Sequence, residues 1–266
     1  MRTSSNPAFK NLPKGGYADF NYGQPAGGAF GGAQAPTTPK QAGRPLTIDD
    51  VVTKTAITLA ITIGTAAATY IIGGPQSMAL VLPAAIVGFV LALVNVFKKK
   101  VSPALVIAYA AVEGVFLGGI SYMFAALVGG SGIIMQAIAG TMGVFAAMLV
   151  VYKTGAIRVT PKLTKWVIGA AAGAFTLMLV NLVAGFFVEG GLGLRSSDGG
   201  LLAIGFSLLC IGIAAFVFLL DFDEADRAIK SGVDARVSWY IAFSLMVTLI
   251  WLYLEILRLL SYLQND

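Results

Sequence analysis

Residues 77–100 have the sequence SMALVLPAAIVGFVLALVNVFKKK, and this stretch decides the fold of the chain. Its first 21 residues carry no charge, and three lysines follow at once. A helix of roughly 20 apolar residues is long enough to cross the hydrocarbon core of a bilayer. Basic residues gather at the cytoplasmic ends of such helices. The stretch therefore predicts a transmembrane helix that ends in the cytoplasm.

Apolar runs of similar length stand on both sides of this stretch. Turn-forming or charged segments separate them, such as Gly73-Gly74-Pro75 and the DFDEADRAIKSG segment at 221–232. We expect seven transmembrane helices, near residues 51–73, 77–97, 103–128, 132–153, 163–188, 200–221 and 237–261. Composition agrees, because 57% of the 266 residues are hydrophobic, 12% are charged and the mean hydropathy is +0.82. The predicted fold class is an all-α membrane protein, a seven-transmembrane-helix bundle over residues 47–261.

Residues 1–46 differ from the rest of the chain. They are rich in Gly, Pro, Ala, Gln and Asn, and they lack the apolar core of a signal peptide. Such a segment cannot bury enough apolar surface to offset its ordering entropy, so we expect a disordered N-terminal tail. Its spaced aromatic residues are either contact points for a membrane-protein partner or parts of a solvated tail: Phe9, Tyr17, Phe20, Tyr22 and Phe30.

The basic residues predict the orientation. Sixteen of the 18 Lys and Arg residues fall in the tail or in segments on one side of the predicted helices, and only Arg195 and Arg258 fall on the other side. By the positive-inside rule the N-terminus is cytoplasmic, and seven crossings then put the C-terminus outside. We expect a multi-pass protein of the cell inner (plasma) membrane. The pI of 9.3 points to anionic lipid headgroups as partners, not to nucleic acid.

Several kinds of chemistry are excluded by composition. The chain has no His, so it lacks an HExxH metal site and a Ser-His-Asp triad. Its single cysteine, Cys210, lies in an apolar run and is expected to be a small buried side chain. No glycine-rich segment has the strand–loop–helix setting of a nucleotide site. We therefore expect no enzyme activity, no catalytic residue, no metal site and no cofactor.

Glu113 is the first candidate site residue. It lies about ten residues into the predicted helix 103–128, near the middle of the bilayer at 1.5 Å rise per residue. Ala110, Gly114 and Gly118 form a stripe of small residues beside it, which favours close helix packing. Acids inside a membrane are often functional. Glu113 is thus either an ion or proton site, or a protonated carboxyl that hydrogen-bonds a neighbouring helix.

Further acids stand near the ends of the last two predicted helices. Glu255 lies three residues before Arg258, so the two can form an ion pair near the outer interface. The acids at the end of the predicted helix 200–221 oppose the helix dipole and the basic trend of the other inner segments: Asp221, Asp223, Glu224 and Asp226. They can bind Ca²⁺ or share protons, or else Arg227 and Lys230 neutralise them.

Three segments resemble the bacterial Bax inhibitor/YccA family of the transmembrane BAX inhibitor motif superfamily. They are EGVFLGGIS at 113–121, LLDFDEAD at 219–226 and WYIAFSLMVTLIWLYLEILRLL at 239–260. The similarity covers about residues 47–261. It implies a seven-helix bundle whose last helix is central. It also implies a passive, pH-sensitive Ca²⁺ leak that a pair of aspartates on helices 6 and 7 gates.

Of the aspartate pair that the resemblance implies, only one member has an aspartate as its counterpart in this chain. The helix 6 aspartate corresponds to Asp221 or Asp223. For helix 7, alignment on the arginine segment LYLEILRLL puts Thr248 where the second aspartate is expected, and a shifted alignment puts Glu255 there. The pair is therefore incomplete or altered in this chain.

Two functional hypotheses follow. The first is a leak for Ca²⁺ or another cation, with Glu113, Asp221, Asp223 and Glu255 as ion-binding or gating residues. The alternative is a non-catalytic membrane interaction protein that modulates another membrane complex or a membrane protease. An intramembrane aspartyl protease fits worst, since the predicted depths of Glu113 and Asp221 differ by about half a bilayer.

Overall fold

The computed structural model describes residues 44–98, 101–188, 192–195 and 200–264. Within this part the chain is helical and has no β-strand; the predicted tail lies outside it, apart from residues 44–46. The seven α-helices are α1 (Ile48–Gly73), α2 (Ser77–Phe97), α3 (Pro103–Val128), α4 (Gly132–Thr154), α5 (Pro161–Ala184), α6 (Leu201–Lys230) and α7 (Ser238–Gln264). Short 3-10 turns, Gly74–Gln76 and Ala235–Val237, precede α2 and α7.

The helix expected near 200–221 is longer than predicted. It continues through the charged segment as α6 and ends at Lys230. Ion pairs at i,i+4 spacing, Asp223 with Arg227 and Asp226 with Lys230, stabilise these extra turns. The prediction that the helix ends near 221 was wrong, because it took the end of the apolar run for the end of the helix.

The helix expected near 163–188 is displaced toward the N-terminus. The Thr160 hydroxyl accepts a hydrogen bond from the backbone N–H of Leu163 at 3.2 Å, and Pro161 occupies the first helical position. Both features begin α5 two residues earlier than expected. The helix ends at Ala184, and turns follow to residue 188.

The surface of the helices fits a bilayer. In the described residues, six helical stretches are long and apolar enough to cross a membrane. Large apolar side chains lie exposed on them, among them Ile72 (85%) and Leu201 (88%). Apolar exposure on this scale requires lipid around the helices. The chain is therefore a multi-pass integral membrane protein. The first of the six stretches, Ile48–Phe97, contains both α1 and α2, so the expected seven crossings stay a prediction.

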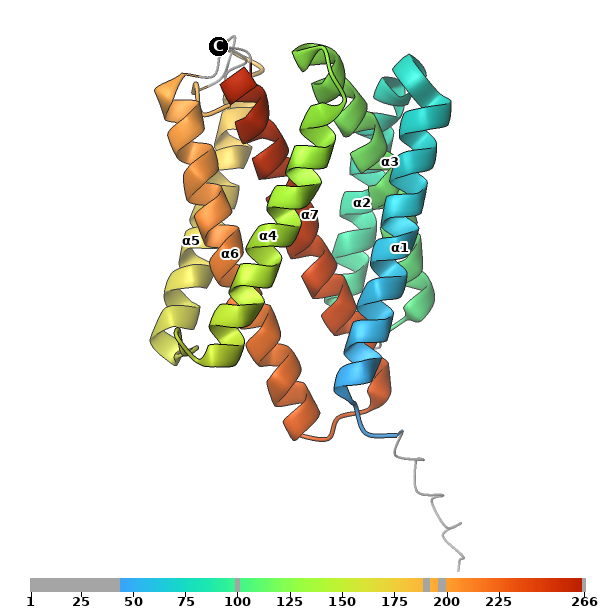
Figure 1. Cartoon of the computed structure of the whole chain (residues 1–266), viewed down its shortest axis with the longest axis vertical. Coiled ribbons are helices and arrows are strands. Elements are labelled where there is room, and N and C mark those ends of the chain that lie inside the picture. Colours follow the sequence, from blue (N-terminus) through green and yellow to red (C-terminus); the bar gives the residue numbers. More distant parts are fainter. Residues whose placement is uncertain (1–43, 99–100, 189–191, 196–199, 265–266) are drawn as a thin grey trace, which may run out of the picture. The chain divides into compact units, whose positions relative to one another are not determined.

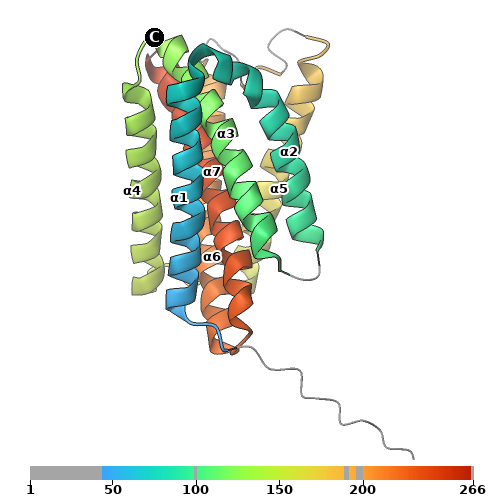
Figure 2. The ribbon, with the colours of Figure 1, turned by 90° about the vertical axis from the view of Figure 1, so that its right-hand side faces the viewer.

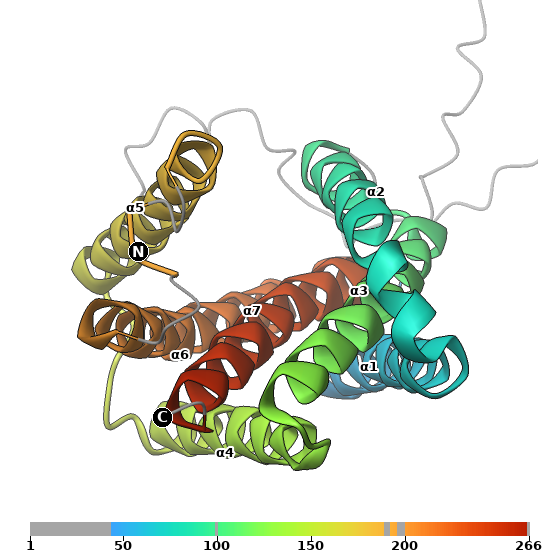
Figure 3. The same cartoon turned by 90° about the horizontal axis from the view of Figure 1, so that it is seen from above.

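Helix α7 lies at the centre of the bundle, as the resemblance implies. Figure 3 shows it between α6, α4, α3 and α1, and it packs against all four. Of the six stretches long enough to cross a membrane, the one that contains α7 is the most buried, since 67% of its most apolar segment lies inside the protein. Helix α5 packs mainly on α6, and α2 packs mainly on α3. Several polar residues of α7 are thus buried in protein, among them Thr248 and Glu255.

Helix α3 approaches α1 closely through its small residues. Side chains of methyl size at Gly114 or Gly118 would meet the backbone carbonyls of Thr62 and Ala66 in α1, both at 2.5 Å. The Thr62 hydroxyl also donates a hydrogen bond to the carbonyl of Ala110, which is fully buried (3.1 Å). The predicted role of this stripe in close packing is confirmed.

The bundle has one end rich in basic residues, which we call the basic end. Here α1, α3, α5 and α7 begin and α2, α4 and α6 end (Figures 1 and 2). Residues 44–46 pair with the α6–α7 connection, since the backbone N–H of Leu46 donates to the carbonyl of Val233 at 2.8 Å. Leu46 is 3% exposed, and Pro45 and Asp234 form an antiparallel bridge. The start of α1 is therefore fixed beside the α6–α7 connection.

Candidate functional site

Asp221 forms a hydrogen-bonded site between α6 and α7. The Ser244 hydroxyl donates to its Oδ1 and the Thr248 hydroxyl donates to its Oδ2, both at 2.7 Å. Ser244 and Thr248 stand one turn apart on α7, so they face α6 together. The Thr248 hydroxyl also lies 3.2 Å from the carbonyl of Ser244. Both carboxyl oxygens of Asp221 thus contact the central helix.

The surroundings of Asp221 are mainly apolar, and Glu224, one turn later on α6, is close enough to interact with it electrostatically. The side chain is 8% exposed, and the adjoining buried residues of the two helices are apolar: Phe218, Phe222, Leu245 and Leu249. Among the described residues, no Lys or Arg forms a salt bridge with Asp221. A carboxyl group in such a place depends on its two hydroxyl partners.

Asp221 directly follows the apolar run of α6, as expected. Nine further residues of α6 follow it, and the packing of α7 buries it, which the sequence did not indicate. Asp223 and Asp226 are the acids that lie toward the end of the helix, where Arg227 and Lys230 pair with them. Within the described ranges, no group of three or more acidic or cysteine side chains is placed to hold a metal ion. Arg227 and Lys230 thus neutralise Asp223 and Asp226, which is one of the alternatives that the sequence left open.

Glu255 forms a second buried charged group. Arg195, from the α5–α6 connection, donates to its Oε1 at 2.6 Å, and Arg258 lies 3.4 Å from the same oxygen. The pair with Arg258 was expected, and the contact with Arg195 was not. Glu255 is only 1% exposed, so protein surrounds it on all sides. At the end of the bundle opposite the basic end, two arginines thus contact one glutamate inside the protein.

This group contains buried polar atoms that lack hydrogen-bond partners among the described residues. They are Glu255 Oε2, Arg195 Nε and Trp251 Nε1. The Arg195 Nη2 also lies 3.0 Å from the sulfur of Met178 on α5. Buried polar atoms nearly always have partners, in the protein or outside it.

Glu113 lies apart from both groups. Its carboxyl lies against α2 at Gly88, where an added Cβ would be 2.9 Å from Oε1. The Tyr109 hydroxyl, one turn earlier on α3, lies within hydrogen-bonding reach of the carboxyl. The absence of a side chain at position 88 makes room for Glu113. The site is half-buried between α2 and α3, consistent with either interpretation made from the sequence.

The four predicted site residues thus occupy four different surroundings. Asp221 faces α7, Asp223 pairs with Arg227, and Glu255 contacts two arginines; Glu113 lies against α2. Sequence reasoning missed Ser244 and Arg195 as partners. The sequence holds a signal for each of them. Ser244 precedes Thr248 by one helical turn, so the two hydroxyls lie on the same face of the helix. Arg195 and Arg258 are the two basic residues on the side that has few, and Glu255 stands three residues before Arg258.

The Asp221 site can respond to a proton or a cation. A carboxylate accepts hydrogen bonds from both hydroxyls at once, whereas a protonated carboxyl must donate one. Uptake of a proton therefore requires Ser244 or Thr248 to rearrange. Because these groups lie on α7, such a change acts on the contact between α6 and the central helix.

Comparison with known proteins agrees with this architecture. A family model described as Bax inhibitor 1 like matches residues 6–265. No curated protein sequence matches the chain. The family match spans nearly the whole chain, including every helix and all the residues discussed above. This chain therefore belongs to the Bax inhibitor 1 like family.

Proposed function

We propose that this protein is a passive, pH-sensitive leak for Ca²⁺ or a similar cation, with Asp221 as its control point. The observation that carries the proposal is the burial of Asp221 between α6 and α7 with both oxygens bound by hydroxyls of the central helix. An acid in the membrane interior is costly, and such acids mark ion and proton pathways. The family membership supports the same function.

Thr248 takes part in this control site. It donates to Asp221 at the position where the resemblance implies a second aspartate. With a threonine there, the site holds one titratable group and not two. We therefore propose control by a single proton at Asp221, which changes the hydrogen bonds between α6 and α7. Glu113 lies outside this control site and is a candidate for the ion path between α2 and α3.

A flux assay tests the proposal. The purified protein is reconstituted into vesicles that contain a Ca²⁺-sensitive dye, and Ca²⁺ uptake is compared with that of empty vesicles. The matched variants are Asp221→Asn and Asp223→Asn, because both residues lie on α6 and only Asp221 contacts α7.

We expect wild-type flux well above that of empty vesicles. Asp221→Asn should change the flux several-fold, while Asp223→Asn should leave it close to wild type. Wild-type flux equal to that of empty vesicles would refute the leak. Equal effects of the two substitutions would refute Asp221 as its control point.

The topology belongs to the same proposal. We infer seven crossings of the inner (plasma) membrane, with α1 and α2 crossing separately, the basic end in the cytoplasm and the C-terminus outside. The basic residues of that end support this orientation, among them Lys98, Arg158 and Lys230. We also propose that the protein is not an enzyme.

A second candidate function is the modulation of another membrane complex or a membrane protease. The aromatic residues spaced along the Gly- and Pro-rich tail favour it, since they are suited to contact a membrane-protein partner. Deletion of residues 2–46, followed by a native pull-down, tests this role. An unaltered set of partners would exclude the tail as the binding segment.

A further inference from the structure

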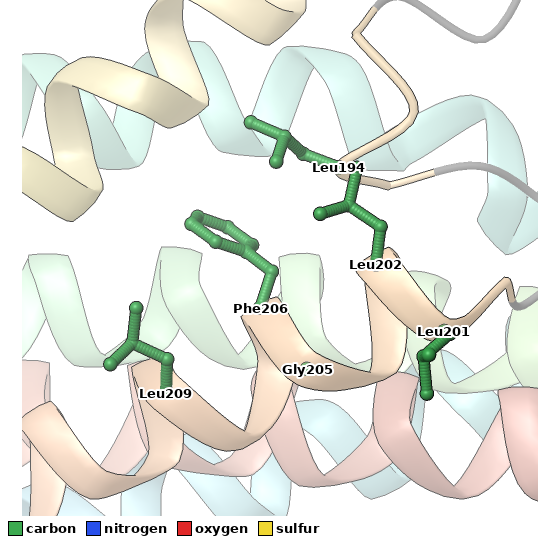
Figure 4. A pocket seen from close by; sticks show the side chains of 6 residues that line it. All are labelled: Leu194, Leu201, Leu202, Gly205, Phe206 and Leu209. Carbon is green, nitrogen blue, oxygen red and sulfur yellow. The ribbon is translucent and has the colours of Figure 1, made fainter.

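An apolar groove lies beside α6 at the end opposite the basic end. Its volume is about 570 Å³, and its lining residues are Leu194, Leu201, Leu202, Gly205, Phe206 and Leu209. In Figure 4 the side chains of Leu194, Leu202, Phe206 and Leu209 project into the space between α6 and α5. Gly205 adds to this space, because nothing lies within 4 Å of the position that a Cβ would take. The groove is open and apolar, so it suits a hydrocarbon chain.

The groove adjoins the charged group around Glu255. Leu194 lines the groove, and its neighbour Arg195 binds Glu255. Phe206 of the groove and Trp251 of α7 belong to one apolar cluster with Cys210. A molecule whose apolar chain lies in the groove therefore has its polar end close to Arg195.

Among the residues that the structure describes, the charged group holds two cations and one acid. Arg195 and Arg258 both contact the carboxylate of Glu255. Arg195 Nε and Trp251 Nε1 are buried here, and neither donates a hydrogen bond to another described residue. A guanidinium binds phosphate oxygens well, because its N–H groups match their geometry. The arrangement fits a ligand that is both anionic and apolar.

We propose that this groove and Arg195 form a binding site for one anionic phospholipid. An acyl chain lies along Leu202, Phe206 and Leu209, and the phosphate pairs with Arg195. Glu255 limits the affinity, since its carboxylate competes with the phosphate for the guanidinium. The apolar groove accepts any acyl chain, so the positive charge supplies the preference for an anionic headgroup. The site does not depend on the proposed leak.

Because Arg195 attracts the phosphate and Glu255 competes with it, substitutions at these two residues should change lipid binding in opposite directions. Thermal unfolding of the full chain in detergent is followed with added phosphatidylglycerol, with phosphatidylcholine of the same acyl chains, and with inorganic phosphate. We expect phosphatidylglycerol to stabilise the wild type at lower concentration than phosphatidylcholine. Arg195→Gln should abolish this preference. Glu255→Gln should strengthen it by about fivefold, the factor expected for one charge near a membrane surface.

Two further variants serve as controls. Arg158→Gln removes an exposed cation at the basic end and should leave the preference unchanged. Arg195→Lys keeps the charge and should keep most of the preference. Equal stabilisation by the two lipids in the wild type would overturn the proposal, as would an equal effect of inorganic phosphate. If Arg195→Gln fails to fold, Glu255→Gln provides the test. A preference for phosphatidylglycerol that is no stronger in Glu255→Gln than in the wild type would contradict the site.

Discussion

At the scale of residues, the proposed function depends on how acids are accommodated inside the protein. Asp221 accepts two hydroxyl hydrogen bonds, Glu255 binds two arginines, and Glu113 lies against a glycine. Only Asp221 combines burial, the absence of a salt bridge among the described residues and direct contact with the central helix. These properties support our proposal that its protonation changes a contact between helices.

Thr248→Asp should spread the response of the leak to pH over a wider range. The new carboxylate would lie within hydrogen-bonding distance of Asp221, because the threonine hydroxyl is 2.7 Å away. Two carboxylates at that spacing share a proton and titrate as a coupled pair. The measurement is Ca²⁺ flux in vesicles over a series of pH values.

Thr248→Ser is the control for this substitution, since it keeps the hydroxyl donor. It should retain the wild-type pH response. If the Asp and Ser variants gave the same response to pH, Thr248 would not be part of the control site.

At the scale of elements, the contact between α1 and α3 is the tightest place for a substitution. Gly114→Ala would drive a methyl group into Thr65 and into the carbonyl of Thr62. The backbone of α1 cannot yield as a flexible side chain does, so the substitution should cost about 1–3 kcal/mol. The midpoint of thermal unfolding in detergent should fall by several degrees.

Gly143→Ala on α4 is a matched control. It also lies inside a helix, but nothing stands within 4 Å of the added methyl group. Alanine favours the helix over glycine by about 1 kcal/mol, so the midpoint should stay the same or rise. Equal losses for both variants would contradict the close approach of α1 and α3.

The elements could largely be predicted from the sequence, and the site only in part. Apolar runs between turn residues placed α2 and α3 at their observed bounds. The end of α6 could not be found in this way, because hydropathy falls at residue 221 while helix formation continues through i,i+4 ion pairs. The partners of Asp221 and Glu255 come from distant segments, so only helix packing reveals them.

At the scale of the whole molecule, the bundle separates two kinds of polar region. The basic end holds the α6–α7 connection and the buried Leu46. The opposite end holds the group of Arg195, Glu255 and Arg258, with the apolar groove beside it. The Asp221 site lies within α6 between these regions, where a change at α7 acts on the core of the bundle.

Cysteine labelling of intact cells tests this topology. In a Cys210→Ala background, Gln76→Cys and Ser131→Cys should react with a membrane-impermeant maleimide from outside. Lys98→Cys and Ser231→Cys should react only after the membrane is permeabilised. All four positions are exposed in the structure. Protection of Gln76→Cys from outside, together with labelling of Ser131→Cys, would contradict separate crossings by α1 and α2.

The pH profile of Ca²⁺ flux through Asp221→Asn tests the central claim most directly. An asparagine keeps the shape of the side chain but cannot take up or release the proton. We expect flux through the wild type and through Asp223→Asn to vary with pH, and flux through Asp221→Asn to stay constant. A pH-dependent flux through Asp221→Asn that matches the wild-type profile would show that the contact of Asp221 with Ser244 and Thr248 does not control the leak.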